Sequence, residues 1–260
     1  MKRRLDQLVH ERGLAETRQR AQALIMAGLV LVDGRKVEKP GTRVSEDLPV
    51  DIVGPEHPYV GRGGAKLKGA VDRFQVEIDG RTCLDVGAST GGFTDCLLQH
   101  GATRVYSVDV GRGQLDWKLR NDPRVIPVEG CNARYLSREV ISARLDLATV
   151  DVSFISLRMI LPALGNLDLR GPILALVKPQ FAVGRGEVGK GGIVRDAAQH
   201  RRVLVEMAEF CASIGLGVAG AMESPLTGAR GNREFFLYLN CQTASCDSLE
   251  RDIEEIFHGK

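Results

Sequence analysis

The chain has no apolar stretch that approaches the roughly 18 consecutive residues of a membrane-spanning helix. Its first residues, Met1 to Asp6, are mostly charged and lack the apolar segment of a secretory signal peptide. We therefore expect a cytoplasmic protein that does not enter a membrane.

Closely spaced cysteine pairs are also missing. The six cysteines contain no C-x-x-C pair, and several of them lie within apolar stretches. Such cysteines are typically buried free thiols, whereas a zinc site needs ligands at short, regular spacing. We expect no metal site. The cysteines are Cys83, Cys96, Cys131, Cys211, Cys241 and Cys246.

Net charge is small as well, at +2, but it is unevenly distributed. Residues 1–43 contain ten basic and five acidic side chains, so the remainder of the chain is slightly acidic. A total of 260 residues fits one large or two smaller domains, and 43% hydrophobic with 26% charged residues is typical of a globular protein. A small basic N-terminal region attached to a nearly neutral remainder suggests a module that binds a polyanion.

The sequence of this basic N-terminal region predicts its secondary structure. Apolar periodicity predicts short helices over 5–12 and 17–27, and an Asp-Gly turn between β-branched residues predicts a hairpin over 29–37. The strings T-R-Q-R-A, A-G-L-V-L-V-D-G-R-K-V and K-P-G resemble the S4 RNA-binding domain. That resemblance implies a small α+β fold with a basic face for structured RNA. The candidate RNA contacts are Arg4, Arg18, Arg20 and Lys36, together with Arg62 further along the chain.

Residues 54–61 contain two prolines and two glycines and are interpreted as an interdomain linker. The predicted domains are therefore an S4-like domain with its linker over 1–60 and a second domain over 61–260.

The second domain is organised around the stretch L-D-V-G-A-S-T-G-G-F at residues 84–93. An apolar strand, a loop of small residues and a helix follow one another, as in nucleotide sites, where glycines let the backbone approach a ligand closely. The spacing of Gly87, Gly91 and Gly92 departs from the dinucleotide fingerprint, which disfavours a dehydrogenase. Asp85 would repel a pyrophosphate but could hold the ammonium group of an amino-acid-like ligand. The D-x-G-x-x-x-G-G pattern resembles the first motif of S-adenosylmethionine-dependent methyltransferases.

From residue 81 onward, strands alternate with helical segments. This order predicts a doubly wound, Rossmann-like α/β domain with a mostly parallel, seven-stranded sheet, in which ligands bind at the carboxyl ends of the strands. Acidic residues and a lysine stand at several of those ends, and Asp109 follows the second strand, where an acid can bind ribose hydroxyls. Asn132 could contact an adenine edge or could simply form a turn. The expected strands are 81–86, 104–110, 124–128, 145–151, 173–178, 217–222 and 234–240.

Four ionisable residues fall at or beside the same predicted edge: Lys66, Asp151, Lys178 and Glu234. A ribose 2′-hydroxyl is a very weak acid, so its methylation needs a group that orients the hydroxyl and accepts its proton. The order K-D-K-E resembles the FtsJ-type ribose 2′-O-methyltransferases.

The strings D-V-S-F-I-S-L, V-K-P-Q-F and G-N-R-E-F-F-L extend this likeness, and the whole chain resembles the TlyA family of ribosomal RNA cytidine 2′-O-methyltransferases. The resemblance implies S-adenosylmethionine as cofactor, ribosomal RNA or ribosomal subunits as partner, and no stable protein partner. It also implies that the four ionisable residues form a catalytic tetrad. The cofactor-binding residues would be Asp85, Gly87, Ala88, Ser89, Gly91, Gly92, Phe93, Asp109 and Asn132.

Two alternatives remain at this stage. The chain could be a non-catalytic ribosome-assembly factor on a methyltransferase fold, although the intact loop and tetrad argue against it. A haemolysin, the name attached to some members of the family, is disfavoured by the lack of membrane-length apolar stretches. The sequence leaves open whether 16S or 23S RNA, or both, would be the substrate.

Overall fold

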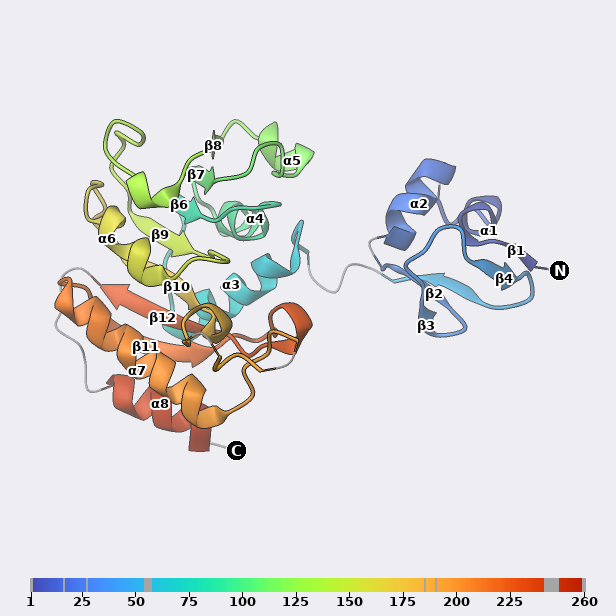
Figure 1. Ribbon diagram of the computed structural model, residues 1–260. Coiled ribbons are helices and arrows are strands. Elements are labelled where there is room, and N and C mark those ends of the chain that lie inside the picture. Colours follow the sequence, from blue (N-terminus) through green and yellow to red (C-terminus); the bar gives the residue numbers. More distant parts are fainter. Residues whose placement is uncertain are drawn as a thin grey trace. The chain divides into compact units, whose positions relative to one another are not determined.

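The computed structural model describes residues 2–15, 17–26, 28–53, 58–184, 186–189, 191–240 and 248–258. The chain divides into two compact units, Met1–Pro58 and Tyr59–Lys260, which are described separately (Figure 1). Part of the expected linker, residues 54–57, lies outside the described residues.

The described residues of the first unit form two helices and two small sheets. Both expected helices are confirmed as α1 (Leu5–Glu11) and α2 (Arg18–Met26), and the expected hairpin is confirmed as β2 (Val30–Val32) and β3 (Arg35–Lys36). The short strands β1 (Lys2–Arg4), β4 (Arg43–Ser45) and β5 (Val50–Ile52) had no sequence signal. Strand β1 pairs with β4, and β5 pairs with β2. Apolar side chains of the helices and strands enclose one small core.

The second unit contains the predicted seven-stranded sheet. Its strands are β6 (Thr82–Val86), β7 (Arg104–Asp109), β8 (Val125–Glu129), β9 (Leu147–Val150), β10 (Ile173–Val177), β11 (Gly217–Glu223) and β12 (Phe235–Asn240). Their spatial order is β11-β12-β10-β9-β6-β7-β8, and β12 runs in the opposite direction to the other six. The mostly parallel Rossmann-like fold is confirmed.

Helices cover both faces of this sheet (Figure 1). One buried apolar cluster joins α3 (Arg62–Phe74), α4 (Gly92–Gln99) and α5 (Trp117–Arg120) to the sheet. A second joins α6 (Leu161–Leu164), α7 (Ala197–Ser213) and α8 (Ser248–His258), and α8 packs against β11. Short 3-10 turns span Ala133–Tyr135, Leu157–Met159, Pro179–Phe181 and Ala229–Gly231. Among the described helices, none has the length and hydropathy to cross a membrane.

The reversed direction of β12 decides where its residues meet the rest of the sheet. Val177, the last residue of β10, pairs with Phe235, the first residue of β12. The residue just before β12 therefore reaches the edge at which the parallel strands end, which is the edge that carries the predicted functional residues.

Candidate active site

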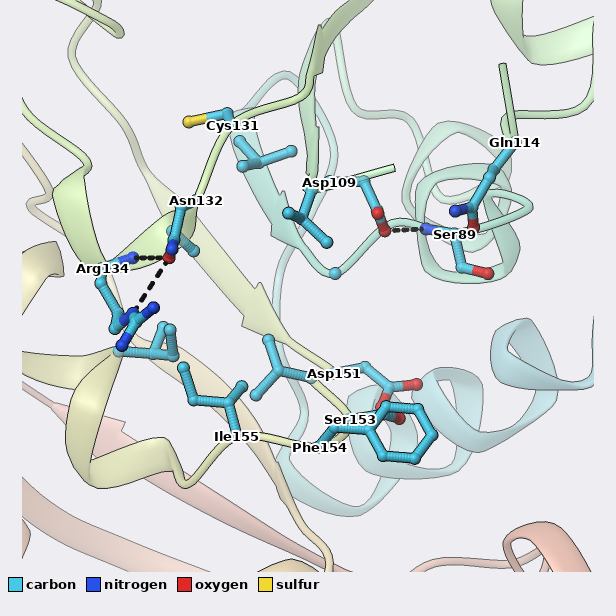
Figure 2. A pocket seen from close by; sticks show the side chains of 16 residues that line it. Ser89, Asp109, Gln114, Cys131, Asn132, Arg134, Asp151, Ser153, Phe154 and Ile155 are labelled. Carbon is cyan, nitrogen blue, oxygen red and sulfur yellow. Dashed lines mark hydrogen bonds between the residues drawn. The ribbon is translucent and has the colours of Figure 1, made fainter. Parts of the chain in front are cut away.

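A cavity of about 470 Å³ opens at the carboxyl ends of β6 to β9. Figure 2 shows its walls, to which the glycine loop, the end of β7, the segment after β8 and the segment after β9 all contribute. Four predicted cofactor residues line this cavity: Gly87, Ser89, Asp109 and Asn132. Asp151 of the predicted tetrad lines it too.

The glycine loop follows its path because two positions admit no side chain. Gly87 has a φ of +87°, and a Cβ there would lie 2.2 Å from the backbone oxygen of Asp151. Gly91 has a φ of +98°, and a Cβ there would lie 2.2 Å from Cδ1 of Leu119. Both positions combine a left-handed backbone with a close approach, so glycine is required at each.

Backbone groups fix the carboxylate of Asp109 at the cavity wall. The N–H of Ser89 donates to Oδ2 at 2.8 Å, and the N–H of Gly111 donates to Oδ1 at 2.7 Å. Each oxygen retains a second lone pair, so the carboxylate can still accept a ligand hydroxyl.

The amide of Asn132 is also held in position. Its oxygen accepts hydrogen bonds from the backbone N–H and the Nε of Arg134, each at 3.2 Å (Figure 2). Asn132 thus caps a 3-10 turn and lines the cavity at the same time. The two sequence interpretations of this residue are compatible.

A second, smaller cavity of about 150 Å³ shares Gly87, Ser89 and Asp151 with the first. Ala88, Gly92 and Phe93 of the predicted cofactor set line it. Arg62 at the start of α3 lines this cavity as well, whereas it was predicted from the sequence as an RNA contact. The starts of α3 and α4 are in close contact, because a Cβ on Gly92 would lie 3.0 Å from the backbone nitrogen of Gly64.

Asp85 is placed differently from the other predicted cofactor residues. Its carboxylate is fully buried and accepts hydrogen bonds from the hydroxyls of Thr94, at 2.7 Å, and Thr149, at 3.1 Å. Burial raises the pKa of Asp85 to about 7, although these hydrogen bonds lower it. Asp85 lines neither of the two cavities. Its hydrogen bonds tie β6 to α4 and β9 beneath the glycine loop.

Lys66 and Glu234 form a buried ion pair. Nζ of Lys66 lies 2.6 Å from Oε2 of Glu234, and the side chains are only 10% and 3% exposed. Gly228 gives Glu234 its space, since a Cβ at that position would lie 1.9 Å from Oε1. Lys68, two positions along α3, instead pairs with Asp72 at the surface, so only Lys66 faces the interior.

Lys178 and Asp151 form a second ion pair one strand away. Nζ of Lys178 also donates to the hydroxyl of Ser153 at 2.9 Å. Val177 of β10 pairs with Phe235 of β12. Lys178 comes directly after Val177, and Glu234 comes directly before Phe235, so the two residues lie beside this pair on adjacent strands. The structure therefore brings all four predicted tetrad residues to one edge as two lysine-carboxylate pairs.

Two of the predicted RNA contacts of the first unit, Arg4 and Arg18, are held by an acidic residue that the sequence did not single out. The fully buried carboxylate of Asp6 accepts from Arg4 at 3.0 Å on both oxygens, from Arg18 at 3.0 Å and from Gln22 at 2.9 Å. Arg4 holds the pKa of Asp6 well below its ordinary value. Arg20 and Lys36 are exposed.

Several cavity residues were missed by the sequence interpretation. Phe154 is the most prominent, with a φ of +64° and a ring that is 91% exposed and lies 5.2 Å from that of Phe181. The string D-V-S-F-I-S-L contains Phe154, yet nothing in it indicates that the ring points outward. The other missed lining residues include Gln114, Cys131, Arg134, Ser153 and Ile155 (Figure 2).

Four of the six cysteines lie within the described residues. Cys83, Cys96 and Cys211 are buried free thiols, Cys131 is partly buried, and Cys241 and Cys246 lie outside the described residues. No group of metal-ligating side chains occurs in the described ranges.

Comparisons with known proteins agree with this architecture. The FtsJ-like methyltransferase family matches residues 59–241, and the S4 domain matches residues 3–50. The 16S/23S rRNA (cytidine-2′-O)-methyltransferase TlyA of Mycobacterium tuberculosis is 48% identical over 242 residues, covering 92% of this chain and 90% of that protein. The chain belongs to the TlyA family.

Two further similar proteins are named as hemolysins. Hemolysin A of Brachyspira hyodysenteriae is 41% identical over 240 residues, covering 90% of this chain and 98% of that protein. The solved structure of a hemolysin-named protein from Streptococcus thermophilus is 41% identical, covers 99% of this chain and 95% of that chain, and has a TM-score of 0.77. The predicted union of an S4 domain with an FtsJ-like methyltransferase domain is therefore confirmed.

Proposed function

We propose that this TlyA-family methyltransferase transfers a methyl group from S-adenosylmethionine to a cytidine 2′-hydroxyl in ribosomal RNA. The observation that carries the proposal is the pairing of Lys178 with Asp151, which lines the larger cavity, and of Lys66 with Glu234 at the same edge of the sheet. A ribosomal substrate also implies that the enzyme acts in the cytoplasm.

The cavity suits S-adenosylmethionine in size and in chemistry. A volume of about 470 Å³ lies within the range of small-molecule sites. In this proposal, Asp109 accepts the ribose hydroxyls of the cofactor, Asn132 contacts its adenine, and the smaller cavity holds its amino-acid end. Asp85 supports the loop from below. When bound, the cofactor supplies a methyl group activated by a sulfonium.

The four tetrad residues would have different roles in the transfer of the methyl group. Lys178 lies beside Asp151, which lines the cavity, so its Nζ is the group that would orient the substrate hydroxyl. The resting ammonium would first release a proton to solvent, and the neutral amine would then take the hydroxyl proton while the methyl group leaves the sulfur and bonds to the 2′-oxygen. Asp151 and Ser153 hold the Lys178 ammonium, and Glu234 holds that of Lys66. The two carboxylates offset the two ammonium charges, so the site can accept a phosphate-bearing substrate without a large excess charge.

The proposed RNA surface of the first unit starts from the Arg4 and Arg18 pair fixed by Asp6, with Arg20 and Lys36 as further phosphate contacts. Guanidinium groups held by a buried carboxylate lose little conformational entropy when they bind phosphate. Arg62 belongs to the second unit and would act near the cofactor cavity.

The test is methyl transfer from labelled S-adenosylmethionine to separated 30S and 50S subunits, followed by nucleoside analysis. We expect label in 2′-O-methylcytidine from at least one subunit, and the labelled subunit identifies the substrate. Binding of cofactor and of ribosomal RNA without any label would instead support the assembly-factor function.

A further inference from the structure

Trp117 is the only tryptophan of the chain, and 78% of its surface is exposed. A tryptophan normally contributes its large area to a core or an interface. Aromatic residues make up only 5% of this chain, and Phe235 and Phe236 are fully buried. An indole directed to solvent in such a chain indicates a binding surface.

Two buried neighbours fix the direction of this side chain. Leu115 and Leu119 flank Trp117, and both would clash with a Cβ on Gly91. The backbone N–H of Asp116 donates to the carbonyl of Thr90 at 3.1 Å, and the Asp116 carboxylate caps α5 by accepting from the N–H of Lys118 at 2.8 Å. Since the leucines point inward, Trp117 between them points outward from a well-anchored turn.

This turn belongs to the edge of the sheet that carries the cavities. Thr90, whose carbonyl holds α5, lines the smaller cavity together with Arg62. Lys118 and Arg120 follow Trp117 on the exposed side of the same turn. The Lys118 side chain is 66% exposed and its Nζ lies 3.6 Å from Asp95, while Arg120 pairs with Glu129 and is 39% exposed. The indole thus stands beside cationic groups at the proposed catalytic face.

We propose that Trp117 is an RNA-binding residue that stacks on an unpaired base of the substrate while Lys118 and Arg120 approach the adjoining phosphates. This inference rests on the proposed function for its substrate class. Exposed aromatic rings bind unpaired bases with little dependence on sequence, and a basic flank favours RNA over an apolar protein surface. The residue would hold RNA outside the cofactor cavity and take no part in the chemistry.

Because Trp117 is the only tryptophan, indole fluorescence reports this one position. Protein-free 16S and 23S ribosomal RNA, titrated into the full-length protein, should quench its emission and protect it from acrylamide. A fully paired RNA duplex at equal phosphate concentration should do so much less. Unchanged emission and acrylamide access, under conditions in which filter binding shows the ribosomal RNA bound, would overturn the proposal.

Variants separate stacking from a structural role. Trp117→Ala should raise the KM for the methylated ribosomal subunit by about 5- to 150-fold, the range expected for one base stacked on an aromatic ring. Trp117→Phe should restore most of the affinity. Neither variant should change kcat or the affinity for S-adenosylhomocysteine. An unchanged KM in Trp117→Ala, or a loss of kcat or of cofactor affinity, would refute RNA stacking.

The same experiments distinguish this inference from the function on which it rests. A wild-type protein that binds ribosomal RNA and quenches, but never transfers label, contradicts the methyltransferase proposal and supports stacking. A wild-type protein that methylates normally, without quenching and without a KM effect in Trp117→Ala, contradicts only the stacking proposal.

Discussion

Nζ of Lys66 lies 2.6 Å from Oε2 of Glu234, although 168 positions separate the two residues in the chain. The contact joins helix α3, the first element of the second unit, to the residue just before β12, the last strand of that unit. Removing one partner of a buried ion pair leaves an unpaired charge in a poorly solvated place.

Glu234→Gln is therefore expected to lower the free energy of unfolding by about 3 kcal/mol, since the Lys66 ammonium loses its counter-charge. The matched control is Asp72→Asn, which breaks the exposed pair with Lys68 on the same helix and should cost less than about 1 kcal/mol. Urea unfolding followed by circular dichroism measures both. Equal losses in the two variants would show that the Lys66 pair is not buried in solution.

Gly87→Ala is expected to destabilise the protein and to weaken its binding of S-adenosylhomocysteine, because the new Cβ would meet the backbone oxygen of Asp151. Gly113→Ala is a suitable control, since Gly113 has a φ of +69° with nothing within 4 Å of the added carbon. That variant should lose only about 1 kcal/mol, from the left-handed backbone alone. Thermal unfolding and titration calorimetry compare the two, and identical behaviour would argue against the close approach at Gly87.

The buried carboxyl of Asp85 predicts a pH dependence of stability. Its pKa is raised from 3.8 to about 7 in the folded protein, so between these values the folded state holds a proton that the unfolded state has released. Stability from this group is present at low pH and falls as pH rises through that window, by at most about 1.4 kcal/mol per unit. Asp85→Asn lacks this dependence.

The measurement is urea unfolding of the wild type and of Asp85→Asn at several pH values between 4 and 7. The wild type should lose stability relative to the variant as the pH rises. A constant difference across this range, or a relative gain, would mean that burial does not raise the pKa of Asp85.

The arginine pair of the first unit predicts a change in salt dependence. Arg18→Ala should weaken binding of ribosomal RNA and reduce the slope of log affinity against log salt by about one, as expected for one lost phosphate contact. Arg12→Ala is the control, because the Arg12 guanidinium donates to backbone carbonyls, including that of Leu48 at 3.0 Å. Filter binding at several salt concentrations measures both variants. Equal slopes in wild type and Arg18→Ala would remove Arg18 from the RNA surface.

The sequence was sufficient for the framework of the protein. Apolar periodicity and turn residues located the seven strands of the large sheet to within about two residues, because each strand is a buried apolar run bounded by turns. Strands β1, β4 and β5 were missed because each has three residues, too few for a periodic signal, and none is marked by a turn like the Asp-Gly between β2 and β3.

The pairing within the tetrad was beyond sequence analysis. Four ionisable residues at one edge allow several partnerships. Which carboxylate each lysine meets depends on how α3 brings Lys66 to Glu234 and on how Lys178 turns toward Asp151 after β9. The sequence also could not predict that Asp85 lies away from both cavities. Its carboxylate is instead bound by the hydroxyls of Thr94 from α4 and Thr149 from β9, which only the fold brings together. The exposure of Trp117 likewise depends on how its leucine neighbours pack.

Lys178 is the residue on which the proposed methyl transfer depends most directly, and one assay tests its role. Lys178→Ala and Lys68→Ala are compared with the wild type for formation of 2′-O-methylcytidine in ribosomal subunits, with S-adenosylhomocysteine binding measured alongside. We predict that Lys178→Ala lowers methyl transfer by about 100-fold or more with cofactor binding retained, as for loss of a general base, and that Lys68→Ala retains wild-type activity. Wild-type methylation by Lys178→Ala would contradict the proposed mechanism.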